Sequence, residues 1–250
     1  MNILFTICGR AGSKGIKNKN IKIFNGKRLP YYSISVIDLY LKKLEENLNY
    51  DIVVNTDSDE LIDIMKDNGL RNVEIIKRNP ELSGDFIGKI SVILDCLNKM
   101  EEKKDVKYDV VVDLDITSPL RTVEDLENLI STHISKNADV TTSVTTARRN
   151  PYFNQVKKTE HGYEKVIASD YSARQQAPEI FDMNASLYAY KPEYLRTGKG
   201  VLDGYVECIE MYDTGILDLD HENDFELMEV IAKYLFLHNQ YMACVYNNIG

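Results

Sequence analysis

The sequence predicts an α/β fold built on a mostly parallel β-sheet with helices on both of its faces. Two observations lead to this prediction. Short apolar runs typical of strands alternate with segments whose apolar residues recur at helical spacing. Several of the strand-like runs end directly in polar and charged residues, as strands do where an α/β sheet binds ligands. The 250 residues suffice for one large α/β domain, and no interdomain linker or internal repeat is visible.

The first half of the chain follows this alternation closely. It predicts, in order, a strand over residues 3–7, a helix over 29–44, a strand over 51–57, a helix over 59–68, a strand over 73–76 and a helix over 87–100. The run 3–7 is apolar throughout apart from Thr6, which is typical of a strand buried on both faces. Gly69 suits the end of the second helix, because glycine adopts the left-handed backbone at little steric cost.

The second half predicts strands over residues 108–115, 139–146 and 187–190, and helices over about 122–135 and 222–237. Thr122 is expected to cap the first of these helices, with Glu124 and Asp125 in the turn where negative charge is favourable. From 148 to 180 a polar, aromatic segment interrupts the alternation and predicts an extra hairpin or an oligomer arm. The last dozen residues show no clear pattern and are expected to fray.

Composition narrows the possible functions. The chain carries 39 acidic and 30 basic residues, a net charge of −9, which argues against general binding to nucleic acid or to a membrane surface. Its four cysteines are scattered and suggest reduced thiols in a cytoplasmic protein. The N-terminus does not have the pattern of a signal peptide, and no apolar run approaches the roughly 20 residues of a membrane span. We therefore expect a cytoplasmic protein with neither kind of partner.

A glycine-rich, cationic segment follows the first predicted strand at residues 9–20, with the sequence GRAGSKGIKNKN. This is where α/β proteins bind anionic ligands, and the glycines allow the backbone to bend and approach closely. Its donors suited to phosphate oxygens are Arg10, Ser13, Lys14 and Lys19. The spacing matches neither a P-loop nor a dinucleotide fingerprint. The alternative interpretation is a basic surface loop without a ligand.

Asp218 and Asp220 form a second informative pair. In an extended segment, alternate residues share one face, so both carboxylates point the same way. Mg²⁺ relieves their mutual repulsion with the hard oxygen ligands that it prefers. Together with the cationic loop, the pair indicates metal-assisted chemistry on a nucleoside triphosphate. Two exposed acids near a helix N-terminus are the simpler alternative.

Two further strands end in polar residues. Asp113 and Asp115 close the strand over 108–115, and we expect them either to contact a metal or sugar hydroxyl or to cap the next helix. Asn55 and Asp57 close the strand over 51–57, where turn formation is the favoured role.

With these residues in hand, the chain resembles the CMP-sialic acid synthetase family of acylneuraminate cytidylyltransferases, over residues 1 to about 235. The matching motifs are RAGSKG with Lys19 and Asn20, RNPEL at 78–82, TSPLR at 117–121, RQQAP at 174–178, NA at 184–185 and LDLD at 217–220. The resemblance implies a Rossmann-like α/β domain over residues 1–250, a homodimer and an inserted dimerisation segment at about 145–185. It also implies transfer of CMP from CTP to the anomeric hydroxyl of a nonulosonic acid, with release of pyrophosphate and a requirement for Mg²⁺.

The resemblance also implies roles for individual residues. Those expected to bind the nucleotide are Arg10, Gly12, Ser13, Lys14, Lys19, Asn20 and Arg78. Those expected to bind the sugar are Asp115, Thr117, Ser118, Arg174, Gln175 and Asn184. Those expected to act in catalysis are Arg10, Lys14, Lys19, Asp218 and Asp220, of which Asp218 and Asp220 would also bind the metal.

Asp115 stands where sialic-acid enzymes typically have glutamine. The stretches over 113–121, 147–154 and 182–186 resemble instead the legionaminic acid branch, whose sugar has an amino or amido group at C7 and a deoxy C9. On this hypothesis, Asp115 accepts a hydrogen bond from that N–H group. The alternatives are a CMP-N-acetylneuraminate synthetase, a nucleotide-binding protein without turnover, and a nucleotidyltransferase acting on a sugar 1-phosphate.

Overall fold

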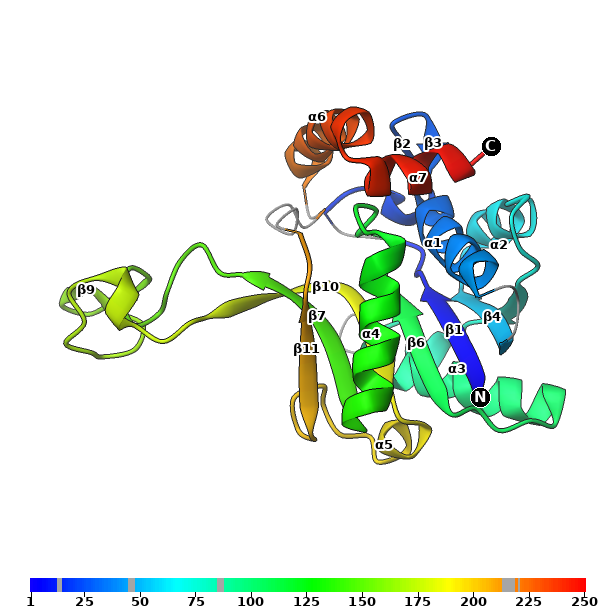
Figure 1. Cartoon of the computed structure of the whole chain (residues 1–250), viewed down its shortest axis with the longest axis horizontal. Helices are drawn as coiled ribbons and strands as arrows, with labels where there is room; N and C mark the ends of the chain where they lie inside the picture. The colour runs from blue at the N-terminus through cyan, green and yellow to red at the C-terminus, as the bar shows by residue number, and fades with distance from the viewer. Residues whose placement is uncertain (13–14, 45–47, 85–87, 213–218, 220) are drawn as a thin grey trace.

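The computed structural model describes residues 1–12, 15–44, 48–84, 88–212, 219 and 221–250. Within them, seven strands form the central sheet in the order β11-β7-β10-β6-β1-β4-β5 (Figure 1). Their bounds are β1 (Asn2–Cys8), β4 (Asn49–Thr56), β5 (Glu74–Lys77), β6 (Val110–Leu114), β7 (Val140–Thr146), β10 (Phe181–Tyr190) and β11 (Val206–Glu210). β10 runs antiparallel to β6 and β7, and the other neighbouring strands pair in parallel. The mostly parallel α/β sheet is thus confirmed.

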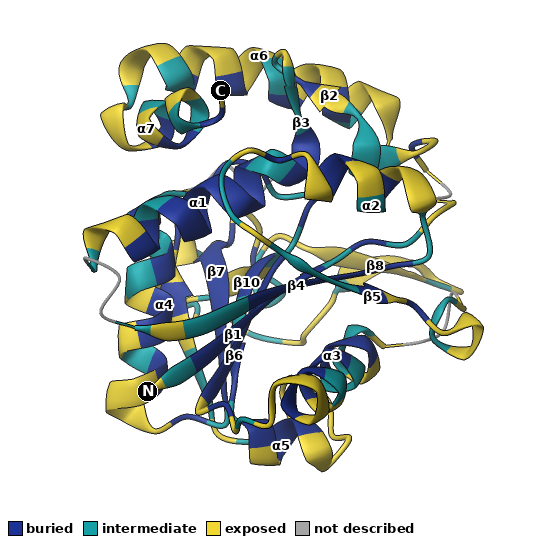
Figure 2. Cartoon of the chain, turned by 90° about the vertical axis from the view of Figure 1, so that its right-hand side faces the viewer, coloured by how far each residue is buried: buried dark blue, intermediate teal, exposed yellow. Residues whose placement is uncertain are grey.

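Helices cover both faces of this sheet (Figure 2). Their bounds are α1 (Leu29–Lys43), α2 (Asp59–Lys66), α3 (Lys89–Lys104), α4 (Val123–Lys136), α5 (Pro192–Arg196), α6 (Glu222–His238) and α7 (Gln240–Asn248), with short 3-10 helices η1 (Lys19–Ile21), η2 (Pro80–Leu82) and η3 (Arg174–Gln176). A hydrophobic core lies on each face of the sheet. Successive side chains of β1 enter the two cores in turn, because neighbouring residues of a strand point to opposite faces. Phe5 packs in the core shared with α1, α4, α6 and α7, whereas Leu4 packs in the core shared with α3 and α5.

The predicted helix cap at Thr122 is present. The Thr122 hydroxyl accepts a hydrogen bond from the Asp125 backbone N–H at 3.1 Å, and the Asp125 carboxylate accepts one from the Thr122 backbone N–H at 2.7 Å. This reciprocal pair satisfies two backbone donors and fixes the start of α4 directly after the TSPLR motif.

The segment between β7 and β10 forms an arm that projects from the sheet (Figure 1). It contains an antiparallel hairpin of β8 (Val156–Thr159) and β9 (Gly162–Lys165). The expected extra hairpin is therefore confirmed, while a role in dimerisation stays a prediction.

The expectation that the last dozen residues fray is wrong. They form α7, whose Met242 and Val245 are buried against the rest of the core. The Asn248 side chain also donates hydrogen bonds to Ser35 at 3.2 Å and to Asp38 at 2.8 Å on α1. The sequence pattern is weak because α7 is short and is stabilised by contacts with α1.

Other short elements have little periodicity and were not predicted. These are β11, α5, and the small hairpin of β2 (Ile23–Phe24) and β3 (Lys27–Arg28). Among the described residues, no helix is both long enough and apolar enough to cross a membrane.

Candidate active site

A pocket of about 340 Å³ opens at the sheet edge where the parallel strands β1, β5 and β6 end. It is lined by Cys8, Arg10, Lys19, Asn20, Arg78, Leu82, Gly84, Lys89, Val92, Asp115 and Thr117. Open α/β sheets bind ligands at this edge. The fold therefore brings together residues from three separate predicted motifs, namely the cationic loop, RNPEL and the end of β6 with the start of TSPLR.

The cationic loop is held against the end of β4. The Gly9 backbone N–H donates to the Asn55 carbonyl at 3.1 Å, and the Ala11 backbone N–H donates to the Asp57 carboxylate at 2.6 Å. The Asn20 side chain donates to the Arg10 carbonyl at 3.0 Å and so ties the two ends of the loop together. Asn55 and Asp57 consequently do more than form a turn, because they position the loop.

Two glycines permit this path. A Cβ atom at Gly9 would lie 2.8 Å from side-chain carbons of both Leu61 and Ile116, too close for any other residue without movement. Gly12 adopts a φ of +71°, the left-handed region that glycine enters at little cost.

Lys19 connects the loop to the acidic segment near the C-terminus. Its ammonium group donates to the carbonyl oxygen of Leu219 at 2.6 Å, and Leu219 is fully buried. Leu219 lies between Asp218 and Asp220, which fall outside the described residues, as do Ser13 and Lys14. Within the part of the chain that is described, no group of three or more His, Cys, Asp or Glu is arranged to hold a metal. Magnesium binding by Asp218 and Asp220 thus stays a prediction.

Arg78 is fixed beside this loop by the end of β4. Its guanidinium donates to the Asn55 side-chain oxygen at 2.7 Å and to the Asn55 carbonyl at 3.1 Å. Only 8% of Arg78 is exposed, so these hydrogen bonds offset the cost of burying its charge. The arrangement orients a cation at the pocket wall.

Asp113 and Asp115 lie on either side of Lys89, the first residue of α3. The Lys89 ammonium lies 2.6 Å from the Asp113 carboxylate and 2.7 Å from that of Asp115. Asp113 is fully buried and also accepts a hydrogen bond from the Thr6 hydroxyl at 2.7 Å. The sequence analysis did not identify Lys89, since nothing in its local pattern separates it from other lysines at the start of a helix.

Lys89 and Asp115 keep each other ionised. Burial tends to raise the pKa of Asp115, but Lys89 and the hydrogen bonds from Thr117 hold that pKa at about 2. Burial likewise tends to lower the pKa of Lys89, yet Asp113 and Asp115 raise it well above its ordinary value. Both partners are therefore charged at neutral pH.

Arg121, the last residue of TSPLR, stabilises the fold and does not line the described pocket. It is fully buried, and its guanidinium donates to the Ser186 carbonyl and to the Ser33 hydroxyl, both at 2.9 Å. Burial lowers the pKa of Arg121 to about 10. These bonds join the segment between β6 and α4 to β10 and α1. Ser118 of the same motif does not line the described pocket.

Three other predicted sugar-binding residues also lie away from the described pocket wall. Arg174 and Gln175 belong to η3 in the arm, where Arg174 donates to the Ala147 carbonyl at 3.0 Å. The Asn184 side chain accepts from the Ser143 hydroxyl at 2.6 Å, within the irregular part of β10. Their roles in substrate binding stay predictions.

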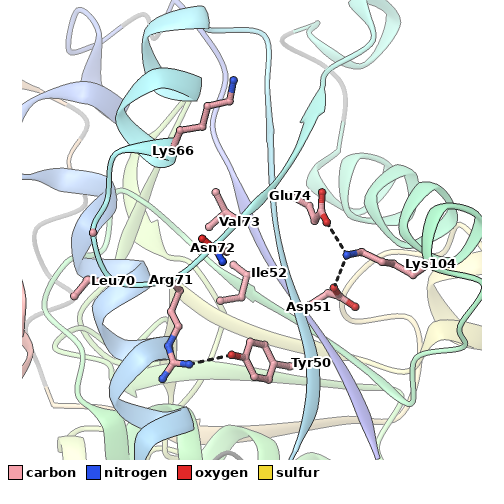
Figure 3. A pocket seen from close by; sticks show the side chains of 11 residues that line it. Tyr50, Asp51, Ile52, Lys66, Leu70, Arg71, Asn72, Val73, Glu74 and Lys104 are labelled. Carbon is pink, nitrogen blue, oxygen red and sulfur yellow. Dashed lines mark hydrogen bonds and ion pairs between the residues drawn. The ribbon is translucent and has the colours of Figure 1, made fainter.

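A larger hollow of about 690 Å³ lies at the opposite edge, where β4 and β5 begin. Figure 3 shows that Lys104 is paired with two carboxylates of the hollow and that Arg71 is hydrogen-bonded to a tyrosine. Lys104 bridges Asp51 at 3.4 Å and Glu74 at 2.6 Å, and Arg71 donates to the Tyr50 hydroxyl at 3.0 Å. These internal pairs stabilise the surface, so the pocket beside the cationic loop is the better candidate active site.

Comparison with known proteins agrees with this geometry. Residues 4–236 match the sequence signature of the cytidylyltransferase family. The chain belongs to that family. It is accordingly a CTP-dependent nucleotidyltransferase, as the cationic loop and the strand-end pocket indicated.

Two relatives and one solved structure resemble this cytidylyltransferase. CMP-N,N′-diacetyllegionaminic acid synthase of Campylobacter jejuni is 34% identical over 231 residues, covering 92% of this chain and 95% of the relative. N-acylneuraminate cytidylyltransferase of Streptococcus agalactiae is 26% identical over 241 residues, covering 94% and 54%. The structure of CMP-2-keto-3-deoxy-manno-octonic acid synthetase complexed with CTP matches with a TM-score of 0.65 at 15% identity, covering 94% and 99%, which shows a shared fold.

Proposed function

We propose that this cytidylyltransferase transfers CMP from CTP to the anomeric hydroxyl of a nonulosonic acid of the legionaminic acid type. The observation that carries the proposal is the 2.6 Å contact between Lys19, which lines the pocket, and Leu219, the residue between Asp218 and Asp220. Similarity to a CMP-N,N′-diacetyllegionaminic acid synthase over nearly the whole chain supports this choice of sugar.

In the proposed reaction, the anomeric hydroxyl oxygen attacks the α-phosphorus of CTP. A new P–O bond forms as the bond from the α-phosphorus to the pyrophosphate oxygen breaks, and the hydroxyl proton passes to a base, for which Asp218 is the candidate in this chain. Arg10 and Lys19 line the pocket beside the loop, where their charges would stabilise the negative charge that develops on the phosphoryl oxygens. Ser13 and Lys14 would add donors from the same loop, and Arg78 would lie near the cytosine.

Asp218 and Asp220 would hold the Mg²⁺ ion. The donor chemistry fits, because two carboxylates two residues apart supply hard oxygen ligands, and Lys19 contacts the residue between them. A bound Mg²⁺ ion would neutralise part of the charge of the triphosphate.

We further propose that the enzyme is a cytoplasmic homodimer in which each arm reaches the partner. The arm and its base expose large apolar side chains, which are costly to leave in water. They are Val156, Tyr163, Val166, Ile167, Phe181 and Met183. Arg174 and Gln175 lie on the same arm and would reach the partner's pocket. The four cysteines are free thiols, in keeping with a cytoplasmic enzyme.

Pyrophosphate release with CTP and a panel of nonulosonic acids tests the sugar specificity. We expect kcat/KM for N,N′-diacetyllegionaminic acid to exceed that for N-acetylneuraminate by roughly tenfold or more. A clear preference for N-acetylneuraminate would favour the alternative CMP-N-acetylneuraminate synthetase. If the protein binds CTP but releases no pyrophosphate with any acceptor, it is a nucleotide-binding protein without turnover instead.

A further inference from the structure

We infer that Lys89 donates a hydrogen bond to a neutral oxygen atom of the acceptor sugar, such as the carbonyl of an N-acyl group. The inference rests on the proposed function and specifies what the acceptor must present to this side of the pocket. It reverses the hydrogen-bond polarity expected from the sequence, in which the Asp115 carboxylate accepts from an N–H of the sugar.

Both carboxylate oxygen atoms of Asp115 already accept hydrogen bonds. One oxygen accepts both the backbone N–H and the hydroxyl of Thr117, each at 2.8 Å. The other accepts from the Lys89 ammonium at 2.7 Å. Since a carboxylate oxygen accommodates about two donors, three of the roughly four acceptor positions of Asp115 are filled before any substrate binds.

The Lys89 ammonium has three N–H donors. Asp115 accepts one of them at 2.7 Å, and the Asp113 carboxylate forms an ion pair with the ammonium at 2.6 Å. Among the described residues, no third hydrogen-bond acceptor contacts this ammonium, although the ring of Tyr188 lies 5.9 Å away. Because the Lys89 side chain is 32% exposed and lines the pocket, its third donor is accessible to a ligand.

The charges along the pocket wall indicate which part of the substrates lies beside Lys89. Lys89 and the neighbouring Arg121 balance the charges of Asp113 and Asp115, so this wall has no net positive charge to attract the triphosphate. Arg10 and Lys19, on the loop side of the pocket, favour it. A neutral, oxygen-bearing part of the sugar is therefore the better occupant beside Lys89. Two carboxylates hold the ammonium in place, which gives the contact a defined direction.

The test compares Lys89→Met with a matched control, Lys103→Met. Lys103 lies on the same helix and is also ion-paired, to Glu74 at 2.7 Å, but it is outside the pocket. Steady-state pyrophosphate release is measured at varied CTP and varied N,N′-diacetyllegionaminic acid. For Lys89→Met we expect the acceptor KM to rise by about tenfold to hundredfold and the CTP KM to stay within about twofold, as for a lost hydrogen bond to a charged donor. Lys103→Met should match the wild type.

A second measurement removes the acyl group from the sugar. The wild-type enzyme should prefer the N-acetylated acceptor to the free amino analogue, and Lys89→Met should lose most of that preference. If Lys89→Met does not fold because Asp113 has lost its cation, the double variant Lys89→Met with Asp113→Asn removes the uncompensated charge, and the same shifts are expected.

Three results would overturn the inference: an unchanged acceptor KM in a folded variant, an equal rise in the CTP KM, or a wild-type preference for the free amine. The last would instead support Asp115 as the acceptor of a substrate N–H. If the wild-type enzyme releases no pyrophosphate with any nonulosonic acid, the proposed function fails, and this inference fails with it.

Discussion

The ammonium group of Lys19 lies 2.6 Å from the carbonyl oxygen of Leu219, although 200 residues separate them in the chain. Leu219 is fully buried, so the contact joins the cationic loop after β1 to an anchored point in the segment before α6. A basic loop and an acidic pair are each common in surface sequences. The contact places Lys19, which lines the pocket, beside the residue that separates Asp218 from Asp220, and this supports the proposed chemistry on a triphosphate.

Lys19→Met should impair catalysis strongly. The change removes a cation from the pocket and also the contact with the acidic segment, and we expect kcat/KM to fall by roughly hundredfold or more. Lys22→Met is the matched control, because Lys22 is paired with Glu222 at 2.7 Å and does not line the pocket. Pyrophosphate release measures both. Equal activity of the two variants would contradict the role of Lys19.

Ala185→Gly should stabilise the protein. Ala185 has a φ of +52°, a left-handed conformation that costs a residue with a Cβ atom about 1 kcal/mol. Glycine avoids this strain, so we expect a gain of about 0.5–1 kcal/mol in the free energy of unfolding. Ala189→Gly, on the same strand at a buried position, should destabilise instead. Urea denaturation gives both values, and a loss of stability in Ala185→Gly would refute the strain argument.

The protein should become less stable as the pH falls, because of His133. This side chain is 3% exposed, and its Nε2 atom has no hydrogen-bond partner among the described residues. Burial and, to a smaller extent, Lys191 lower the pKa of His133 from 6.5 to about 4. Between these values the unfolded chain binds a proton that the folded protein does not, so stability is lost as pH falls through this window.

The contribution of His133 is measurable by urea denaturation at two pH values. When the pH is lowered from about 7.5 to about 5, His133 should reduce the free energy of unfolding by about 2 kcal/mol. The glutamine of His133→Gln cannot titrate but keeps a polar group beside Thr141. Over the same pH interval, the free energy of unfolding of this variant should therefore fall by about 2 kcal/mol less than that of the wild type. Identical pH profiles for the two proteins would rule out this source of acid sensitivity.

Polar substitutions on the arm should dissociate the proposed homodimer. Phe181 and Met183 are each 41% exposed at the base of the arm, and replacing both by serine removes apolar contact area. We expect sedimentation velocity to show a dimer for the wild type and a monomer for this variant. Leu202→Ser is the control, since Leu202 is 67% exposed but lies outside the arm. A monomeric wild type would contradict the proposal directly.

The long elements of the fold could be predicted because their signals are local. The apolar run at the start of the chain identifies β1, helical spacing identifies α1 and α4, and Thr122 marks a cap through its own neighbours. The location of the cationic loop at a strand end also follows from consecutive residues. Weak or short elements such as β11 and α7 escaped prediction, because packing against distant residues stabilises them more than their own periodicity does.

The composition of the site depended on packing instead. Strand order decides that the end of β4 meets both the loop after β1 and Arg78, so that Asn55 becomes a positioning residue. Likewise, only the placement of α3 against β6 shows that Lys89 occupies both Asp113 and Asp115. The sequence by itself determined which residues carry the charge, since that is a property of each side chain. The tertiary structure decided which charges meet and which hydrogen-bonding groups remain for substrates, because those depend on distances between segments far apart in the chain.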